Sequence, residues 1–286
     1  VRVHSNLPAR VSMNPHEYEV FDELTTEHGV LYAEDEEAKT LRVESVGDAE
    51  LSKFVPFIKQ YADKKGLKKL SVKVSDSQAL YFFQHGFQVE ASILAYYGMQ
   101  DAIFVVCYMD DELPDTNTEQ HTILEQALSG HAARADTHQV QNVTISNAGM
   151  AAKVKIEDAD KLVYPGREVL TGSNSLESTK FFAQIGNKTV ATAHAQFNKT
   201  DKAVEFSDFT VNTEYDANVL IAALLADMEA FYLSKKCLTA FTIVSANSLE
   251  INTICAENHY EFGGTLKNES VIENSLVSLN TWFKRL

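Results

Sequence analysis

Two acidic residues, Glu205 and Asp208, lie in the stretch VEFSDFTV, whose β-branched and aromatic residues are typical of a β-strand. Carboxylates on a strand can accept protons or bind cations. Their odd spacing puts them on opposite faces of a regular strand, whereas a β-bulge would bring both to one side. The alternative is that both are solvated acids at a strand edge.

The residues that follow predict a tight loop and a long amphipathic helix, so that 204–236 forms a strand, a loop and a helix. The apolar residues of the helix recur at helical spacing, namely Leu220, Leu224, Met228 and Phe231. Where a strand enters a helix through a short loop, free backbone N–H groups and the positive end of the helix dipole converge. This loop is therefore the candidate site for an anionic ligand.

The composition predicts a folded protein of two domains. The chain has 286 residues, more than one typical domain, and 45% of them are hydrophobic. A net charge of −15 argues against nonspecific nucleic-acid binding, because no broad basic face can neutralise phosphates. The acidic balance permits a small cationic substrate, although many acidic proteins bind no cation.

Three scattered cysteines, Cys107, Cys237 and Cys255, form no CxxC motif. An odd, dispersed set favours reduced, mostly buried thiols in a cytoplasmic protein. The nine histidines show no spacing typical of a zinc site, so no metal is expected. The longest apolar runs look too short to cross a bilayer, and no membrane association is expected.

The first half predicts strand, helix, strand, helix and then a hairpin. These elements are expected at 41–46, 51–65, 70–74, 77–85, 88–97 and 102–109, after short strand-like pieces at 19–21 and 29–33. Gly66 is expected to end the first helix, because glycine readily adopts the left-handed conformation found at helix ends.

A change of composition at 110–136 marks a boundary, since Pro114 and an acidic run precede a connecting helix expected at 119–135. The second half predicts a helix start at 157–160, an irregular corner at 164–166, strands at 180–185 and 189–197, the strand–loop–helix stretch, a strand at 238–245, a helix at 248–258 and strands at 262–266 and 276–283. This order repeats that of the first half. We expect an α/β (α+β) fold with domains at 1–113 and 143–286, joined by an acidic linker and connecting helix at 114–142, each domain a mixed, mostly antiparallel sheet flanked by helices.

The C-terminal pattern is the most specific in the chain. It consists of YEFGGTL at 260–266, Asn268, and SLNTWFK at 278–284. It resembles the ending of the β-lysine N-acetyltransferase family, a member of the GNAT acetyltransferase superfamily. Ser207-Asp208-Phe209 with Glu214-Tyr215, Asn252, and the hairpin after His85-Gly86-Phe87 are also similar to that family. The resemblance implies tandem GNAT-like domains, of which the first carries no catalytic motif, and acetyl-CoA as co-substrate.

The sequence departs from GNAT enzymes at the loop that holds the CoA pyrophosphate, R/Q-x-x-G-x-G/A. Here the corresponding, cofactor-binding positions are Asp216, Ala217, Asn218, Val219 and Leu220, and no glycine occurs between Gly186 and Gly263. Glycines would let backbone N–H groups approach the phosphates closely. Asp216 instead places a carboxylate beside them, and Thr213-x-x-Asp216 predicts a capping box that satisfies the helix's own N-terminal donors. These residues disfavour acetyl-CoA binding.

By resemblance, an amine would be deprotonated by Glu205, through water or directly, while Asp208 binds the cationic substrate. The backbone around Thr210, through the N–H of Phe209 or Val211, would hold the thioester oxygen. Cys255 aligns with the general-acid tyrosine of the family, and its alternative is a buried structural thiol. Two further positions have an open role: Asn252 could contact the pantetheine or pack locally, and His194 could line the site or face solvent.

Two functions follow. The first is an acetyl-CoA-dependent N-acetyltransferase acting on the amine of a small, β-lysine-like amino acid, in which case a homodimer is possible and no nucleic acid or membrane takes part. The second is a catalytically degenerate GNAT pair that binds a ligand or a protein. The family-like C-terminal strands favour neither, because they would serve the fold in both cases.

Overall fold

A computed structural model describes residues 20, 23–24, 26–109, 118–129, 142–149, 155–156, 160–164, 167 and 176–286. These residues fall into two compact units. The first holds the described residues up to Glu90 and those from Ile103 to Met109, and the second holds Ala91–Ala102 and the described residues from Thr118 onward. The predicted boundaries at 113 and 143 stay predictions.

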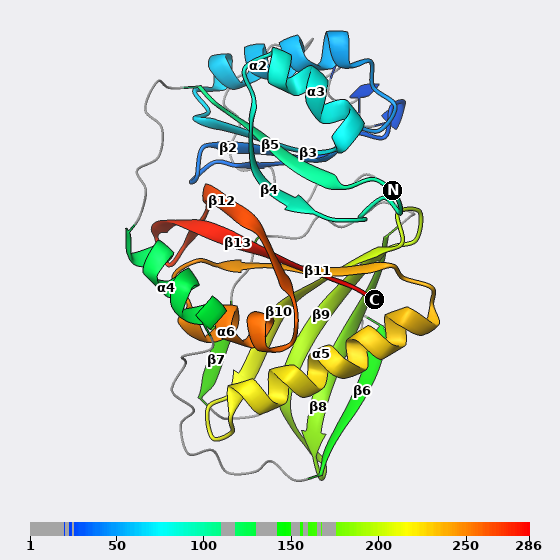
Figure 1. Cartoon of the computed structure of the whole chain (residues 1–286), viewed down its shortest axis with the longest axis vertical. Coiled ribbons are helices and arrows are strands. Elements are labelled where there is room, and N and C mark those ends of the chain that lie inside the picture. The colour runs from blue at the N-terminus through cyan, green and yellow to red at the C-terminus, as the bar shows by residue number, and fades with distance from the viewer. Residues whose placement is uncertain are drawn as a thin grey trace. The chain divides into compact units, whose positions relative to one another are not determined.

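The first unit is a mixed sheet with two helices on one face (Figure 1). Its elements are β1 (Leu31–Asp35), β2 (Thr40–Ser45), α2 (Leu51–Lys65), β3 (Lys69–Ser75), α3 (Asp76–Gln84), β4 (Gln88–Ile93) and β5 (Ala102–Tyr108). The end of β4, from Ala91, and the first residue of β5 are counted with the second unit. The strand order is β1-β2-β3-β5-β4, with β1 antiparallel and β3 parallel to β2. Every strand and helix predicted between 41 and 109 is confirmed to within a few residues at its ends, and the piece expected at 29–33 is β1.

Helix boundaries in the first unit follow from local chemistry. Gly66 ends α2 in the left-handed conformation (φ 63°, ψ 32°), as predicted. Ser75 and Gln78 form a capping box at the start of α3. Between them, β3 alternates strictly, so that Leu70, Val72 and Val74 enter the core beneath the helices.

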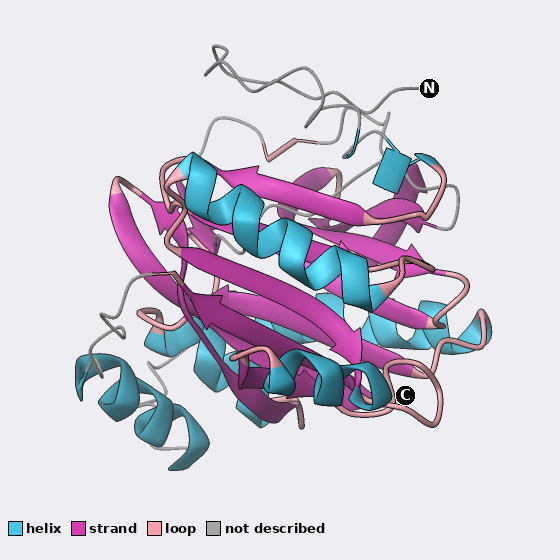
Figure 2. Cartoon of the chain, turned by 90° about the horizontal axis from the view of Figure 1, so that it is seen from above, coloured by secondary structure: helices cyan, strands magenta, loops and turns pink. Residues whose placement is uncertain are grey.

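The second unit contains the longer sheet. Its elements are α4 (Thr118–Ser129), β6 (Val143–Gly149), β7 (Lys161–Tyr164), β8 (Leu176–Ile185), β9 (Lys188–Asn198), β10 (Ala203–Asn212), α5 (Ala217–Ser234), β11 (Thr239–Ser245), α6 (Leu249–Glu257), β12 (Glu261–Ile272) and β13 (Ser275–Arg285). The strand order is β12-β13-β11-β10-β9-β8-β6, and β7 pairs with β10 outside this path. Figure 2 shows the chain from above, with helices lying against the strands.

The two units share the same order of strands and helices, as predicted. In the first unit β2, α2, β3, α3, β4 and β5 are arranged as β10, α5, β11, α6, β12 and β13 are in the second, and the strand orders correspond position by position. In both units the first strand of this series runs parallel to the second. The mixed α/β fold class is therefore confirmed.

Helix α5 supplies the core of the second unit. Its buried residues are Ala217, Leu220, Ile221, Leu224, Leu225, Met228 and Tyr232. They pack on the alternating alanine face of β9, at Ala191, Ala193 and Ala195, whose small side chains let the helix approach the sheet. Of the two aromatic residues expected on the apolar face of the helix, Tyr232 is fully buried and Phe231 is half-buried.

By length and composition alone α5 could span a membrane, contrary to the expectation that every apolar run is too short. In this structure it lies along the sheet, and its apolar stripe forms the core of the second unit. Its apolar character is accounted for by that packing.

Several predicted elements differ from the structure. The strands β6 and β7 were not predicted, since Val143–Gly149 and Lys161–Tyr164 carry weak patterns, and Tyr164 lies in a strand rather than in an irregular corner. The last two strands are longer than expected. The pieces at 19–21, 130–135, 157–159 and 165–166 lie wholly or in part outside the described residues.

We predict that Gly263→Ala destabilises the second unit by roughly 1–3 kcal/mol, the range for overpacking. A Cβ at Gly263 would lie 2.1 Å from the backbone oxygen of Ser92. Gly149, also in a strand, has open space around its Cβ position, so Gly149→Ala should stay within about 0.5 kcal/mol of wild type. Urea unfolding followed by the fluorescence of Trp282 measures both. Equal effects of the two substitutions would contradict the close approach.

Candidate active site

The predicted bulge is present in β10. Ser207 lies opposite His194 of β9 and Thr210 lies opposite Thr192, so one extra residue is inserted between these two pairs. Asp208 adopts a left-handed backbone conformation at this point, with φ 53°. This conformation is uncommon for a residue with a Cβ, and bulges of this kind re-aim side chains. The bulge turns Asp208 out of the regular alternation of the strand.

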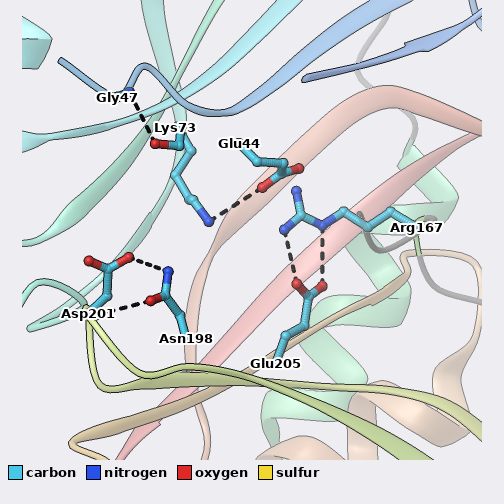
Figure 3. A network of polar contacts seen from close by, with 8 residues as sticks. Glu44, Gly47, Lys73, Arg167, Asn198, Asp201 and Glu205 are labelled. Carbon is cyan, nitrogen blue, oxygen red and sulfur yellow. Dashed lines mark hydrogen bonds and ion pairs between the residues drawn. The ribbon is translucent and has the colours of Figure 1, made fainter. Parts of the chain in front are cut away.

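Glu205 is buried and bound by an arginine. The guanidinium of Arg167 donates from Nε and Nη2 to the two carboxylate oxygens, at 3.3 and 3.2 Å (Figure 3). Both side chains are more than nine-tenths buried. A buried carboxylate needs such a partner, because an unpaired charge would cost several kcal/mol. No sequence pattern indicated this pair, because Arg167 belongs to no recognisable motif and lies far from Glu205 along the chain.

Asp208 faces solvent and contacts His194. Its Oδ2 lies 2.8 Å from Nδ1 of the imidazole, and the two side chains are 55% and 29% exposed. His194 belongs to the face of β9 that points away from α5, because its neighbours Ala193 and Ala195 are in the core. The bulge therefore brings a carboxylate and an imidazole together on the open face of the sheet.

The two parallel strands separate directly beside this bulge. β10 pairs with β11 only from Ala203 to Glu205. From Phe209 to Asn212 it pairs with β7 instead, while Thr210 and Val211 still pair with β9 on the other side. β7 therefore takes the edge of β10 from which β11 has diverged.

The amides expected to hold a thioester oxygen are paired with β7. Thr213 donates its backbone N–H to the oxygen of Asp160, directly opposite it. Hydrogen-bonded pairs alternate along an antiparallel ladder, so Val211 and Phe209 direct their N–H groups to β7 as well. Their side chains lie in the core. An acyl group could use these amides only after β7 leaves.

Tyr164 anchors β7. It is the one buried side chain of that strand, and its hydroxyl donates to Oε2 of Glu250, in the first turn of α6, at 2.5 Å. Burial, followed by this hydrogen bond and the nearby negative charges of Glu250 and Asp216, raises the pKa of the Tyr164 phenol well above its usual range. The phenol therefore stays protonated and donates.

Asp216 caps α5 by itself, and the predicted capping box does not form. Its carboxylate accepts from the backbone N–H of Asn218 at 2.8 Å. Thr213 instead directs its hydroxyl and N–H to the oxygen of Asp160. The expectation that an acid of the chain itself lies at the helix N-terminus is confirmed. Its carboxylate occupies the N–H of Asn218, which an anion could otherwise bind.

The remaining expected loop positions divide between core and surface. Ala217 and Leu220 are buried in the core beneath α5. Asn218 is exposed and Val219 is half-buried. With side chains larger than glycine at all four positions, the backbone here lacks the close access to phosphates that glycines would give.

Asn252 is a structural residue of the core. Its Nδ2 donates to the backbone oxygens of Ser245 (2.9 Å) and Ser248 (2.6 Å), and its Oδ1 accepts from Asn280 (2.9 Å) and from the indole of Trp282 (2.8 Å). Both donors and both acceptor sites of the amide are used. This placement supports local packing over contact with a pantetheine.

Cys255 is 1% exposed in the same core. Burial raises the pKa of its thiol well above the usual range. The buried Cys255 thiol cannot reach a leaving thiolate at the sheet surface. The structure therefore supports the alternative that Cys255 is a buried structural thiol. The catalytic roles of Glu205 and Asp208 stay predictions.

Two curated proteins are similar to this chain along most of its length. The chain is 22% identical over 248 residues to the N-acetyltransferase YodP of Bacillus subtilis. The matched region covers 84% of this chain and 90% of that protein. It is 21% identical over 243 residues to the Beta-lysine N(6)-acetyltransferase of Methanococcus maripaludis, covering 82% and 89%. The chain resembles N-acetyltransferases along most of its length. No family model matches it.

Among solved structures, the ribosomal-protein-alanine N-acetyltransferase of Brucella melitensis shares 18% identity, with a TM-score of 0.35, over 38% of this chain and 67% of that one. The spermidine/spermine N-acetyltransferase SpeG of Vibrio cholerae shares 12%, with a TM-score of 0.36, over 39% and 66%. The resemblance to N-acetyltransferases rests on the two relatives that match along the chain.

We predict that the three thiols react slowly in the native protein. All are buried, and burial raises the pKa of each, that of Cys237 to about 11. At pH 8 the reactive thiolate is therefore scarce. Alkylation by iodoacetamide, measured by mass spectrometry, should be at least a hundredfold slower than in urea. Rapid native labelling of Cys255 would restore it as a candidate acid.

We predict that Asn252→Ala destabilises the second unit by about 3 kcal/mol or more, because it leaves buried donors of Asn280 and Trp282 unpaired. Asn258, on the same helix, makes one part-buried hydrogen bond to the oxygen of Ile254. Asn258→Ala should therefore cost about 1 kcal/mol. Urea unfolding compares the two, and similar losses would argue against the network.

Proposed function

We propose that this protein is an acetyl-CoA-dependent N-acetyltransferase that acts on the amine of a small cationic, β-lysine-like amino acid. The observation that carries the proposal is the similarity to two curated N-acetyltransferases over more than four-fifths of the chain, one of them a β-lysine N6-acetyltransferase. The parallel strands β10 and β11, which diverge beside Asp208, agree with it.

A cationic amine fits the charges of this region. Asp208 is exposed on the open face of β10, and the chain as a whole is strongly acidic. A carboxylate there would attract an ammonium group and position it beside the strand. Glu205 contributes less to the attraction of an ammonium group, because the guanidinium of Arg167 neutralises its charge.

Acetyl-CoA, a substrate consumed in the reaction, requires β7 to leave the edge of β10. This rearrangement involves one short strand. β7 spans only Lys161–Tyr164, and Lys161, Leu162 and Val163 are exposed, so that Tyr164 alone loses buried contacts. A short strand with one anchoring side chain belongs to the less stable parts of a fold. The acyl chain would replace backbone hydrogen bonds that β7 now makes.

The second candidate is a degenerate pair that binds a ligand or protein without turnover. Asp216 at the start of α5 and β7 on the edge of β10 favour it, because together they occupy the positions expected for the diphosphate and the thioester. The two candidates differ in one measurable property, which is the affinity for acetyl-CoA.

We predict that Asp216→Asn binds acetyl-CoA about tenfold more tightly than wild type, a difference of roughly 1.4 kcal/mol. Asparagine still caps a helix, so the variant removes the charge and keeps the fold. Asp227→Asn, at an exposed position of the same helix, is the charge-matched control and should leave the affinity unchanged. Isothermal titration calorimetry at low salt measures all three.

Product formation then separates the candidates. Wild type is incubated with acetyl-CoA and β-lysine, lysine or spermidine, and acetylated amines are quantified by mass spectrometry. Acetyl-β-lysine formed faster than the uncatalysed reaction supports the enzyme. Binding of acetyl-CoA without product, or no binding even by the Asp216 variant, overturns it and leaves the binding module.

A further inference from the structure

A carboxylate–imidazole pair stands at the point where β10 bulges. The carboxylate of Asp208 reaches Nδ1 of His194 only because the bulge adds a residue between Ser207 and Thr210. The left-handed conformation of Asp208 is energetically unfavourable for a residue with a Cβ. A strained residue that aims its side chain at one partner is the kind of local cost that functional sites retain.

The second nitrogen of His194 is available. Within the described part of the chain, Asp208 is the sole polar partner of His194, and the imidazole is 29% exposed. A carboxylate beside Nδ1 favours the tautomer with the proton on Nδ1, which leaves the lone pair on Nε2. The pair therefore presents a proton acceptor of fixed orientation to the open face of the sheet.

Glu205, the base expected from the sequence, is less suited to the task. Both of its oxygens accept hydrogen bonds from Arg167, and it is buried. A proton acceptor needs a free lone pair within hydrogen-bond reach of the amine. His194, on the strand next to β10 and about 5 Å away across the sheet, offers such a lone pair on Nε2.

We propose that His194 is the general base that deprotonates the amine substrate, and that Asp208 is a positioning residue that holds its tautomer. The proposal rests on the function proposed above and names the group that carries out its proton transfer. Asp208 directly precedes Phe209, whose amide borders the expected position of the thioester. The base and the acyl group would then meet at the bulge.

The step balances as follows. The substrate ammonium gives one proton to Nε2 of His194, and its nitrogen forms a bond to the acetyl carbonyl carbon. The bond from that carbon to the CoA sulfur breaks, and the departing thiolate takes up the second proton of the nitrogen. His194 then passes its proton to water.

The charged groups around His194 come from both neighbouring strands. On β10 these are Asp208 and, on the same face, the neutralised Glu205. On β8, Lys180 lies directly opposite His194 in the register. These are the charged groups that face His194 from the two strands paired with β9.

The test compares kcat/KM for the amine in wild type, His194→Gln and Asp208→Asn from pH 6.5 to 9.5. Glutamine can keep the contact to Asp208 and cannot act as a base. We expect His194→Gln to lose about a hundredfold at pH 7, within the range for general bases. The deficit should shrink about tenfold per pH unit, because the amine increasingly reacts in its free form. Asp208→Asn should lose about tenfold.

The matched control is His28→Gln. His28 makes the same Nδ1 contact, at 2.9 Å, with Asp48 in the first unit, where no chemistry is proposed. Its substitution should leave kcat/KM unchanged at every pH. Two-bond ¹H–¹⁵N spectra of wild type and Asp208→Asn add a readout that needs no turnover, and should show the Nδ1–H tautomer of His194 in wild type only.

The outcomes are distinguishable. A deficit of His194→Gln that is constant with pH, or no deficit, overturns the base and leaves the acetyltransferase in place. The Nε2–H tautomer in wild type overturns it as well, even if His194→Gln fails to fold. Wild type that acetylates no amine overturns both the proposed function and the base.

Discussion

The second unit depends on a parallel pairing that ends early. β10 and β11 are joined from Ala203 to Glu205, and beyond this point β11 turns away with β13. Backbone N–H and C=O groups left on such an edge need partners. β7 supplies them from Phe209 onward, and α5 begins directly after β10. The environments of Glu205 and Asp208 follow from this divergence.

The same divergence sorts the polar side chains by their environment. Glu205 lies where the strands are still paired, so it is buried and requires Arg167. Asp208 lies where regular pairing fails, so it is exposed and contacts His194. Asn252 lies behind the sheet in the core, where each of its polar atoms has an internal partner. Exposure, more than residue type, separates the candidates for chemistry from those for structure.

The strand pattern recurs in both units, whereas the start of α5 carries a carboxylate of its own. The resemblance to N-acetyltransferases extends along the chain, and the strand order repeats between the units. At the start of α5, however, a carboxylate takes the place that an anion would need. Asp216 stabilises its own helix by capping it.

The sequence by itself determined the elements and their order, since strands such as Lys69–Ser75 and helices such as Leu51–Lys65 are specified by local periodicity and caps. It also indicated the bulge and the acid at Asp216. Only the tertiary structure decided which side chains meet: Arg167 with Glu205, His194 with Asp208, and β7 with the edge of β10. The physical reason is that such pairs join residues far apart along the chain, and their energy depends on burial and backbone register, which no local pattern encodes.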